Sequence, residues 1–186
     1  MNIGKPSETS SSEPVNSICM NLTPEWIAGF TDGEGCFHIS INSHAEMTAG
    51  YQILPEFTVV QHRNDIQILY ALKSYFKCGV VRTNHGDRMA YRVRGLQHHS
   101  EIIVPFFMKH QLKTKKRVDF EKFRDVVLMM QRKEHLTAEG IEKIKAIASD
   151  MNRKQVKIKS DLHGDMQRVE EITTPSSESE SEDVTK

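Results

Sequence analysis

The stretch Trp26-Ile27-Ala28-Gly29-Phe30-Thr31-Asp32-Gly33-Glu34-Gly35-Cys36 decides the fold. Thr23 and Pro24 precede it and supply an N-cap hydroxyl and a proline at the first helical position, where its missing N–H costs nothing. The stretch is therefore expected to begin as a helix. Ala28 and Gly29 fill a core poorly, but they allow two helices to approach closely.

The stretch ends with one acidic residue between two glycines. A turn at Gly33-Glu34-Gly35 is expected to end the helix at about residue 32 and to present the Glu34 carboxylate where a backbone can reach it. The competing interpretation of Glu34 is an ordinary surface turn residue. Asp32 is interpreted as a structural residue at the helix end.

Charge is unevenly distributed along the 186 residues, although the formal net charge is zero. Residues 22–159 contain 22 Lys and Arg against 15 Asp and Glu, whereas residues 160–186 contain two basic and eight acidic residues. We expect one domain at 22–159 between disordered tails at 1–21 and 160–186. A basic domain fits a nucleic-acid ligand, and a solvated surface with a solubilising tail is an equal alternative.

Cysteine usage and hydropathy exclude several other classes. Cys19, Cys36 and Cys78 form neither a disulfide framework nor a zinc pattern, which favours a reducing compartment. The histidines show no zinc spacing either. No apolar run approaches membrane-spanning length, so no membrane partner is expected. The N-terminus has no apolar stretch typical of a secretory signal and is a poor transit peptide.

Apolar and polar residues alternate in two segments that predict β-hairpins. The first has strands at 37–44 and 51–62 around a loop at 45–50, with Pro55 expected to mark a bulge. The second runs from about 80 to 95 around residues 85–87.

Helical periodicity predicts the remaining elements. Helices are expected at 65–77, capped by Asn64 and ended by Gly79, and at 138–150, capped by Thr137. Two more are expected at 98–110 and 115–132. The order αββαββα with further helices predicts an α+β fold, in which helices cover one face of an antiparallel sheet.

The outward positions of the predicted sheet carry side chains that hydrogen-bond to base edges and phosphates. They are His38, Ser40, Asn42, His44, Gln52, Glu56, Thr58, Arg82, Asn84, Arg92 and Arg94. An exposed sheet face is ordinarily polar, so one strand alone would mean little. A strand of about nine residues spans roughly 30 Å, which is on the order of 9 bp of major groove. Two copies of the chain would read on the order of 18 bp.

Cleavage of DNA bound by such a sheet would usually require divalent metals, for which the single Glu34 carboxylate is a poor site. Two chains packed through the helices that end near Glu34 would bring two Glu34 side chains together, and Mg²⁺ would relieve their repulsion. Because the chain holds one copy of this helix and its glutamate, the chemistry predicts a homodimer.

The residues Ile27-Ala28-Gly29-Phe30-Thr31-Asp32-Gly33-Glu34-Gly35 resemble the LAGLIDADG motif. The resemblance implies a homing endonuclease with a saddle-shaped sheet. It places a metal at Glu34 and Gly33, with Mn²⁺ or Ca²⁺ able to replace Mg²⁺ and Ca²⁺ not supporting cleavage. Single-motif members of the family act as homodimers.

The resemblance covers about residues 22–150 and extends to further site residues. Gln61, in Pro55-Glu56-Phe57-Thr58-Val59-Val60-Gln61-His62, is similar to a family glutamine near the scissile phosphate. Lys113 is similar to the active-site lysine, with Lys115 as a near-equal alternative. The other implied positions are DNA contacts at Arg63, Arg82, Lys115 and Lys116, and a dimer interface at Trp26, Ala28, Gly29 and Phe30.

Two departures from the family pattern stand inside the motif: Glu34 replaces the commoner Asp, and Thr31 replaces an apolar residue. The chain is thus expected to be an intron-encoded, sequence-specific endonuclease of double-stranded DNA. It is expected to be encoded by an organelle genome and to lie in a mitochondrion or chloroplast, and a bacterial cytoplasm is the less favoured alternative. The alternative functions are an intron RNA maturase or a catalytically inactive DNA- or RNA-binding relative. A transcription regulator would need an additional helix-turn-helix domain.

Overall fold

The protein is described by a computed structural model for residues 20–152. The acidic segment 160–186 and the N-terminal segment 1–19 lie outside the described residues, as do the last residues of the predicted domain. The elements are α1 (Pro24–Glu34), β1 (Gly35–Ser43), β2 (Tyr51–His62), η1 (Arg63–Asp65), α2 (Ile66–Phe76), β3 (Val80–His85), β4 (Arg88–Val93), α3 (Leu96–His98), η2 (His99–Ile103), α4 (Val104–Lys109), α5 (Lys116–Gln131), η3 (Glu134–Leu136) and α6 (Ala138–Ser149).

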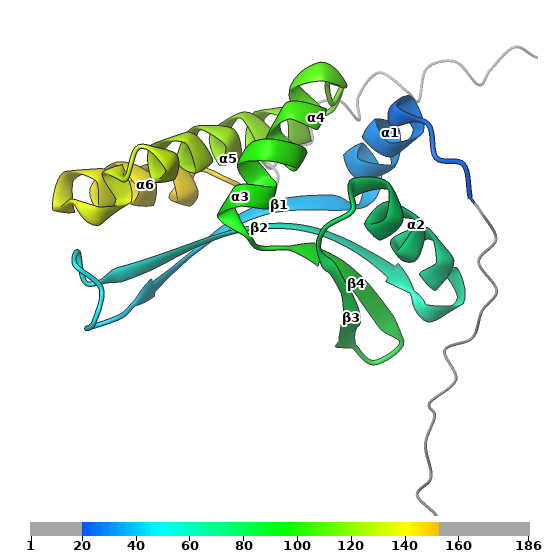
Figure 1. Ribbon diagram of the computed structural model, residues 1–186, viewed down its shortest axis with the longest axis horizontal. Coiled ribbons are helices and arrows are strands. Elements are labelled where there is room, and N and C mark those ends of the chain that lie inside the picture. The colour runs from blue at the N-terminus through cyan, green and yellow to red at the C-terminus, as the bar shows by residue number, and fades with distance from the viewer. Residues whose placement is uncertain (1–19, 153–186) are drawn as a thin grey trace, which may run out of the picture. The chain divides into compact units, whose positions relative to one another are not determined.

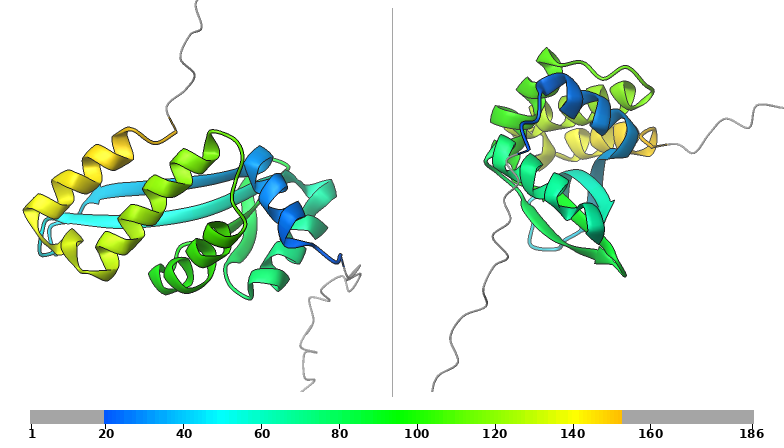
Figure 2. Two further views of the ribbon diagram at one scale, coloured as in Figure 1. Left: turned by 90° about the horizontal axis from the view of Figure 1, so that it is seen from above. Right: turned by 90° about the vertical axis from the view of Figure 1, so that its right-hand side faces the viewer.

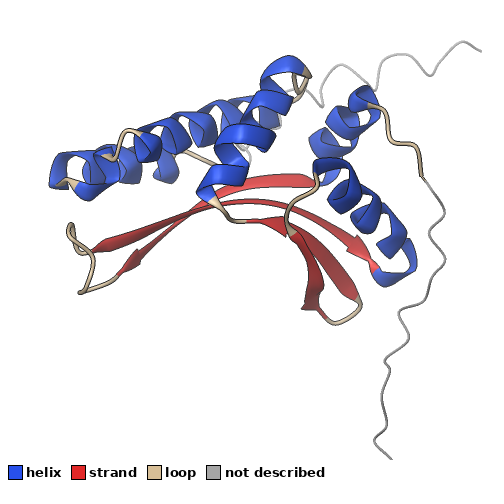
Figure 3. Cartoon of the chain, in the orientation of Figure 1, coloured by secondary structure: helices blue, strands red, loops and turns tan. Residues whose placement is uncertain are grey.

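The four strands form one antiparallel sheet in the order β1-β2-β4-β3. The sheet is curved, and the helices lie on one side of it (Figures 1 and 3). Seen from above, α5 and α6 lie obliquely over one end of the long strands β1 and β2, and α1 lies near the other end (left view of Figure 2). The predicted α+β class and the element order αββαββα are confirmed.

Aromatic rings form the centre of the core between the sheet and the helices. Phe37 of β1 is fully buried, and its ring centroid lies 5.0 Å from that of Phe57 on β2. Phe107 of α4, at 5.4 Å, and Phe123 of α5, at 5.3 Å, approach the same ring from the helical side. Residues from β1, β2, α4 and α5 therefore share one hydrophobic core, which fixes α1 because β1 follows it without a linker.

The strand β2 is regular where a bulge was predicted. Pro55 pairs with Ile39 in an unbroken register from Gly35 opposite Val59 to Ser43 opposite Tyr51. Its side chain is buried on the core side, so the proline continues the alternation instead of interrupting it. The bulge prediction was wrong: β4 pairs with β2 only from residue 57 onward, so at Pro55 the strand has β1 as its one described strand neighbour, and a proline is tolerated at such an edge position.

The Pro55 carbonyl is used by a histidine in the helical layer. His99, in the π-helical turn η2, is fully buried, and its Nε2 lies 3.0 Å from that oxygen. Burial lowers the pKa of His99 to about 4, against an opposing hydrogen bond to the Pro55 carbonyl. The contact ties the middle of the sheet to the predicted 98–110 helix, which the structure forms as α3, η2 and α4.

Two predicted helix boundaries also differ. Asn64 does not cap α2: it lies in the turn η1, and its N–H donates to His62 Nδ1 at 3.2 Å. The helix ends at Phe76, and Lys77 adopts the left-handed conformation with φ of 52°. The predicted cap at Thr137 is confirmed, since its hydroxyl accepts the Gly140 N–H at 3.1 Å.

Candidate active site and nucleic-acid interface

The motif helix α1 runs two residues farther than predicted. Gly33 and Glu34 are helical, and Gly35 starts β1 with extended backbone. A Cβ on Gly35 would lie 2.5 Å from the Thr31 methyl and 2.8 Å from the Thr31 carbonyl oxygen. Only glycine allows the chain to pass from helix to strand this tightly, and Glu34 is thereby fixed on the last helical position.

One face of α1 packs on the core, and the other is bare. Ile27, Ala28 and Thr31 are buried within the chain itself. Trp26, Gly29, Phe30 and Gly33 follow the i, i+3, i+4, i+7 spacing of a single helical stripe. Trp26 is 40% exposed and stacks on Phe30 with ring centroids 4.6 Å apart. We name these four residues the α1 stripe.

The two glycines of the α1 stripe leave open space. A Cβ at Gly29 or Gly33 would have no atom within 4 Å. Their absence of side chains is therefore not required by the packing of this chain. Among the predicted interface residues, Trp26, Gly29 and Phe30 lie on this face, whereas Ala28 faces the core.

Asp32 binds the segment that precedes α5. Its Oδ2 accepts the Lys113 N–H at 2.7 Å, and its Oδ1 accepts the Thr114 hydroxyl at 2.8 Å and the Thr114 N–H at 3.2 Å. Burial alone would raise the pKa of Asp32, but these hydrogen bonds and the nearby Lys116 together hold it below the ordinary value of 3.8. The interpretation of Asp32 as a structural residue agrees with these contacts, and its partners lie about eighty positions away.

The same segment brings an ammonium group to the motif. Lys116 Nζ donates to the Gly33 carbonyl at 3.3 Å. Burial lowers the pKa of Lys116, and the neighbouring Cys36, Asp32, Glu34 and Asp119 oppose that shift. The Gly33 carbonyl is thus an oxygen that already attracts a cation.

Glu34 has no hydrogen-bond or ion-pair partner within residues 20–152, and its side chain is exposed. In that same part of the chain, no three His, Cys, Asp or Glu side chains come together as a group able to hold a metal. One chain therefore offers one carboxylate, with the Gly33 carbonyl beside it. This donor set fits a hard cation such as Mg²⁺, but one copy supplies only part of a coordination shell.

The other predicted catalytic residues lie at the same end of the sheet. Gln61 stands two residues beyond Val59, which pairs with Gly35, so it extends past the start of β1 toward the end of α1. Lys113 is exposed, and its backbone N–H is bound by Asp32. Lys115 is exposed as well. Of the lysines at 113–116, Lys116 has the ammonium that contacts the motif, although the sequence predicted it only as a DNA contact.

Most of the predicted DNA-binding residues share the sheet face that points away from the helices. The strand register places on this face His38, Ser40, Asn42, Gln52, Glu56, Thr58, Arg82 and Arg92, and Arg94 and Asn84 bond to two of them. We name it the outward face. Arg88 also belongs to it and was missed, although its spacing of four from Arg92 could have shown it. Leu54, Val60 and Val80 interrupt the polar cover.

Four predicted DNA contacts lie elsewhere. His44 is in the turn between β1 and β2, where its N–H donates to Gly50 at 2.9 Å. Arg63 is in η1 and pairs with Asp87 at 2.9 Å in an exposed ion pair. Lys115 and Lys116 lie beside the motif helix.

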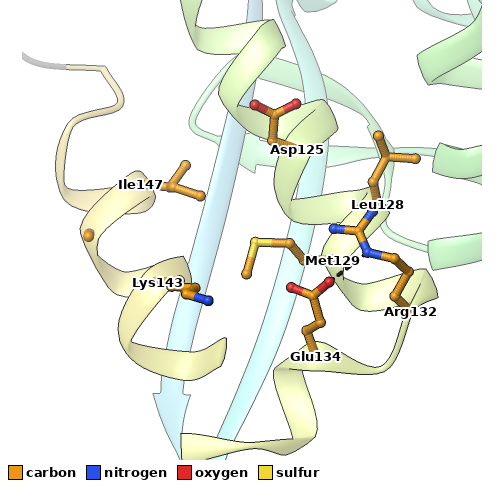
Figure 4. A pocket seen from close by; sticks show the side chains of 8 residues that line it. Asp125, Leu128, Met129, Arg132, Glu134, Lys143 and Ile147 are labelled. Carbon is orange, nitrogen blue, oxygen red and sulfur yellow. Dashed lines mark hydrogen bonds and ion pairs between the residues drawn. The ribbon is translucent and has the colours of Figure 1, made fainter. Parts of the chain in front are cut away.

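A groove between α5 and α6 is distant from these residues. It is lined by Asp125, Leu128, Met129, Arg132, Glu134, Lys143, Ala146 and Ile147 (Figure 4). Arg132 Nε and Glu134 Oε1 close one side of it at 2.6 Å. Its other charged residues, Asp125 and Lys143, pair with Arg124 and Glu139 of their own helices. The groove adds no chemistry to the motif. No helix among residues 20–152 is long and apolar enough to cross a membrane.

The curved antiparallel sheet with its helices on one face and a motif helix leading into β1 is the fold of homing endonuclease domains. The family model described as LAGLIDADG endonuclease matches residues 27–127, and the chain belongs to this family.

Individual relatives and structures agree with this assignment. The probable intron-encoded endonuclease 2 of Neurospora crassa is 29% identical over 143 residues, which are 75% of this chain and 32% of that protein. The crystal structure of the homing endonuclease I-TnaI is 54% identical with a TM-score of 0.70, and the match covers 73% of this chain and 92% of that one. I-SmaMI, bound to an uncleaved DNA target in the presence of calcium ions, is 28% identical with a TM-score of 0.69 over 81% of this chain and 49% of that chain.

The matched lengths differ between these proteins. The chain spans between 24% and 32% of the first curated relatives that it matches, and about half of the I-SmaMI chain. It corresponds to nearly the whole of I-TnaI.

Proposed function

We propose that this protein is a sequence-specific endonuclease of double-stranded DNA that requires a divalent cation and acts as a homodimer on a long pseudo-palindromic site. The observation that carries the proposal is the Glu34 carboxylate. It is exposed and has no hydrogen-bond or ion-pair partner among residues 20–152. It stands at the end of the α1 stripe, next in sequence to Gly33, whose carbonyl accepts from the Lys116 ammonium.

The α1 stripe supports the homodimer. Two open glycines at a spacing of four allow a second helix to come close. Trp26, which stacks on the half-buried Phe30, supplies apolar surface that a partner would cover. A second copy of the stripe would bring a second Glu34 to the first. The similarity of one chain to about half of I-SmaMI agrees with two such domains forming one site.

Cation binding would use Glu34 and the Gly33 carbonyl of each copy. Mg²⁺ held there supplies positive charge that favours water activation and stabilises the leaving oxygen in phosphodiester hydrolysis. The calcium ions in the I-SmaMI structure support a divalent-cation site in this family. In this chain, Mn²⁺ is expected to replace Mg²⁺, and Ca²⁺ to support binding without cleavage.

The chain's own residues would position the phosphate and the attacking water. The Lys116 ammonium, which contacts Gly33, is placed to neutralise charge on a phosphate bound at this corner. Lys113 and Lys115 would contribute from the same segment, and Asp32 holds that segment against α1. Gln61 would orient water through its amide.

The outward face would read the DNA. Its arginines and amides offer donors and acceptors to base edges in the major groove. The DNA-bound I-SmaMI structures, with which this chain shares its fold, support the choice of double-stranded DNA. The names of the fungal relatives support an intron-encoded protein of organellar origin.

The test is cleavage of a duplex that carries the joined sequence flanking the reading frame. With Mg²⁺, we expect wild-type protein to cut both strands, and Glu34→Gln to bind the same duplex with cleavage reduced at least about 1,000-fold. The amide keeps the size of the side chain but loses the charge that a cation requires.

Three outcomes separate the candidates. Wild-type protein that shifts the duplex without cutting it in Mg²⁺ or Mn²⁺ would identify a binding protein instead of a nuclease. A Glu34→Gln variant that cuts at the wild-type rate would remove Glu34 from the cation site. Tight binding of the intron RNA with none of the duplex would favour the maturase.

A further inference from the structure

Glu56 is the only acidic residue in the four described strands. It stands on the outward face of β2 opposite His38, on a surface that otherwise carries arginines and neutral polar groups. A carboxylate at this place repels the phosphates that such a surface would bind. Glu56 therefore needs a role other than raising the affinity for DNA.

Both carboxylate oxygens of Glu56 are engaged within the protein. Oε2 accepts the Nε–H of Arg94. Oε1 accepts the Thr58 hydroxyl at 3.3 Å and lies 3.9 Å from Arg92 Nε. The side chain is only 17% exposed, so little of it remains to meet a base.

Arg92 has one hydrogen bond and one ion pair within the sheet. Its Nη2 donates to Asn84 Oδ1 on β3 at 2.6 Å, while its buried Nε makes no hydrogen bond and lies within ion-pair distance of Glu56. The side chain is 28% exposed. Ala90, which is also an outward position, is fully buried, so the larger side chains around it lie along the sheet instead of extending from it.

We propose that Glu56 is a specificity-determining positioning residue that fixes Arg92 so that its remaining N–H groups meet the edge of one base pair. The chemistry that fits a fixed guanidinium is guanine, whose O6 and N7 accept two N–H groups at once. Arg94, held by the other oxygen, is kept from phosphates by the same carboxylate. The proposal rests on the DNA-binding function proposed above.

The proposal predicts two changes of opposite sign when the charge of Glu56 is removed. Freed arginines can reach phosphates, so binding to unrelated duplex DNA tightens and its salt dependence grows by about one to two counterions. A mobile Arg92 discriminates less between bases, so the preference at the base pair beneath it falls about tenfold. A general loss of folding stability would not produce tighter non-specific binding together with a weaker base preference.

The experiment is selection of bound sequences from a pool of duplexes randomised across the site, with wild-type, Glu56→Gln and Arg92→Ala proteins. A fixed 30-bp duplex of unrelated sequence, titrated at several salt concentrations, reports non-specific binding. Glu121→Gln is the matched control, because Glu121 pairs with Arg117 at 2.9 Å on α5, away from the sheet. It is expected to leave the base preferences unchanged.

We expect Glu56→Gln and Arg92→Ala to lose preference at the same base pair, and the double variant to lose no more than Arg92→Ala alone. Loss of preference at a different base pair, unaffected by Arg92→Ala, would show that Glu56 reads a base directly and would overturn the positioning role. Unchanged preferences in Glu56→Gln would overturn it too. If the wild-type protein selects no sequence and binds no duplex, the proposed DNA-binding function fails first, and the proposal falls with it.

Discussion

The motif corner, formed by the end of α1 and residues 113–116, and the outward face of the sheet use carboxylates in opposite ways. At the corner, Asp32 accepts backbone N–H groups, whereas Glu34 has no hydrogen-bond or ion-pair partner in the part of the chain that the structure describes. On the outward face, Glu56 is engaged by two arginines, and no free carboxylate remains on the strands.

The difference fits what each surface would bind in the proposed function. A cation site needs a carboxylate that is not already engaged, because an engaged carboxylate would have to break its hydrogen bonds before it binds a metal. A surface that reads bases needs side chains held in one geometry, because discrimination depends on the position of their donors. Asp32 and Glu56 are therefore both engaged within the protein, and of these three carboxylates Glu34 is the one left to bind a cation in the proposed site.

The largest effect is expected from closing the open space on the α1 stripe. Gly29→Leu adds a side chain where a Cβ meets no atom of this chain, so the monomer should fold normally. In the proposed homodimer, the same side chain would keep two helices apart and separate the two Glu34 residues. We expect sedimentation to show monomers and cleavage to fall at least about 1,000-fold.

Ser74→Leu provides the control for Gly29→Leu. Ser74 is an exposed position on α2, so it adds the same apolar group to a different helix. It should leave self-association and cleavage unchanged. A Gly29→Leu protein that remains dimeric and fully active would place the dimer interface away from the α1 stripe.

A second, smaller effect is expected at Asp32. Asp32→Ala removes three hydrogen bonds that hold residues 113 and 114, so the lysines of the segment lose their fixed position beside Gly33. We expect cleavage to fall about 100-fold, and the free energy of unfolding to fall by about 2 kcal/mol, measured by urea denaturation. Binding of DNA should change much less than cleavage.

The pH dependence of stability gives a second measurement on Asp32. Because its pKa lies below 3.8, the ionised form stabilises the folded protein above about pH 4, and this contribution is lost as the pH falls through the lowered pKa. Asp32→Ala should lack that part of the acid transition. Asp87→Ala, which removes an exposed ion pair with Arg63, should cost less than about 1 kcal/mol.

Both regions could be partly predicted from the sequence. The motif was visible as small residues followed by an acidic one, and alternation placed most outward residues correctly, because side-chain period is a local property. The pairing of Asp32 with residues 113 and 114 was not visible, since nothing local relates positions eighty residues apart. Lys116 was missed as a neighbour of the motif for the same reason.

Local rules failed where tertiary packing supplied the missing partner. Pro55 predicts a bulge by its lack of an N–H, but β4 does not reach this residue and His99 from the helical layer meets its carbonyl, so the strand stays regular. Gly33 predicts the end of a helix, but the tight passage at Gly35 carries the helix to Glu34. The His99 contact lies outside the segment from which the bulge was predicted, whereas the close approach of Gly35 to Thr31 lies inside the stretch from which the helix end was predicted and depends on backbone geometry that the residue types alone do not give.

The outward face is tested by removing one unengaged arginine. Arg82 is exposed on β3, and within residues 20–152 it has no hydrogen-bond or ion-pair partner. Arg82→Ala should weaken DNA binding up to about tenfold and lower the salt dependence by about one counterion. Lys73→Ala on α2, on the helical side, removes the same charge and should change binding by less than about twofold. Equal effects of the two variants would mean that DNA is attracted by net charge rather than held on the outward face.

The smallest effect is expected at Thr31, where the family motif usually has an apolar residue. Thr31 is fully buried on the core side of α1, and its hydroxyl has no hydrogen-bond partner in the described structure. Thr31→Val replaces the hydroxyl with a methyl of similar size and removes the cost of the unsatisfied group. The free energy of unfolding should rise by about 1 kcal/mol. Thr137→Val is the matched control with the opposite sign, because the Thr137 hydroxyl caps α6 and its loss should cost about 1 kcal/mol.

Cleavage gives a second measurement on Thr31→Val, because Glu34 stands three residues after Thr31 on the same helix. If the hydroxyl serves only packing, cleavage at saturating DNA should stay within about twofold of wild type. A Thr31→Val protein that is more stable but cuts markedly more slowly would show that the buried hydroxyl is retained for the position of Glu34.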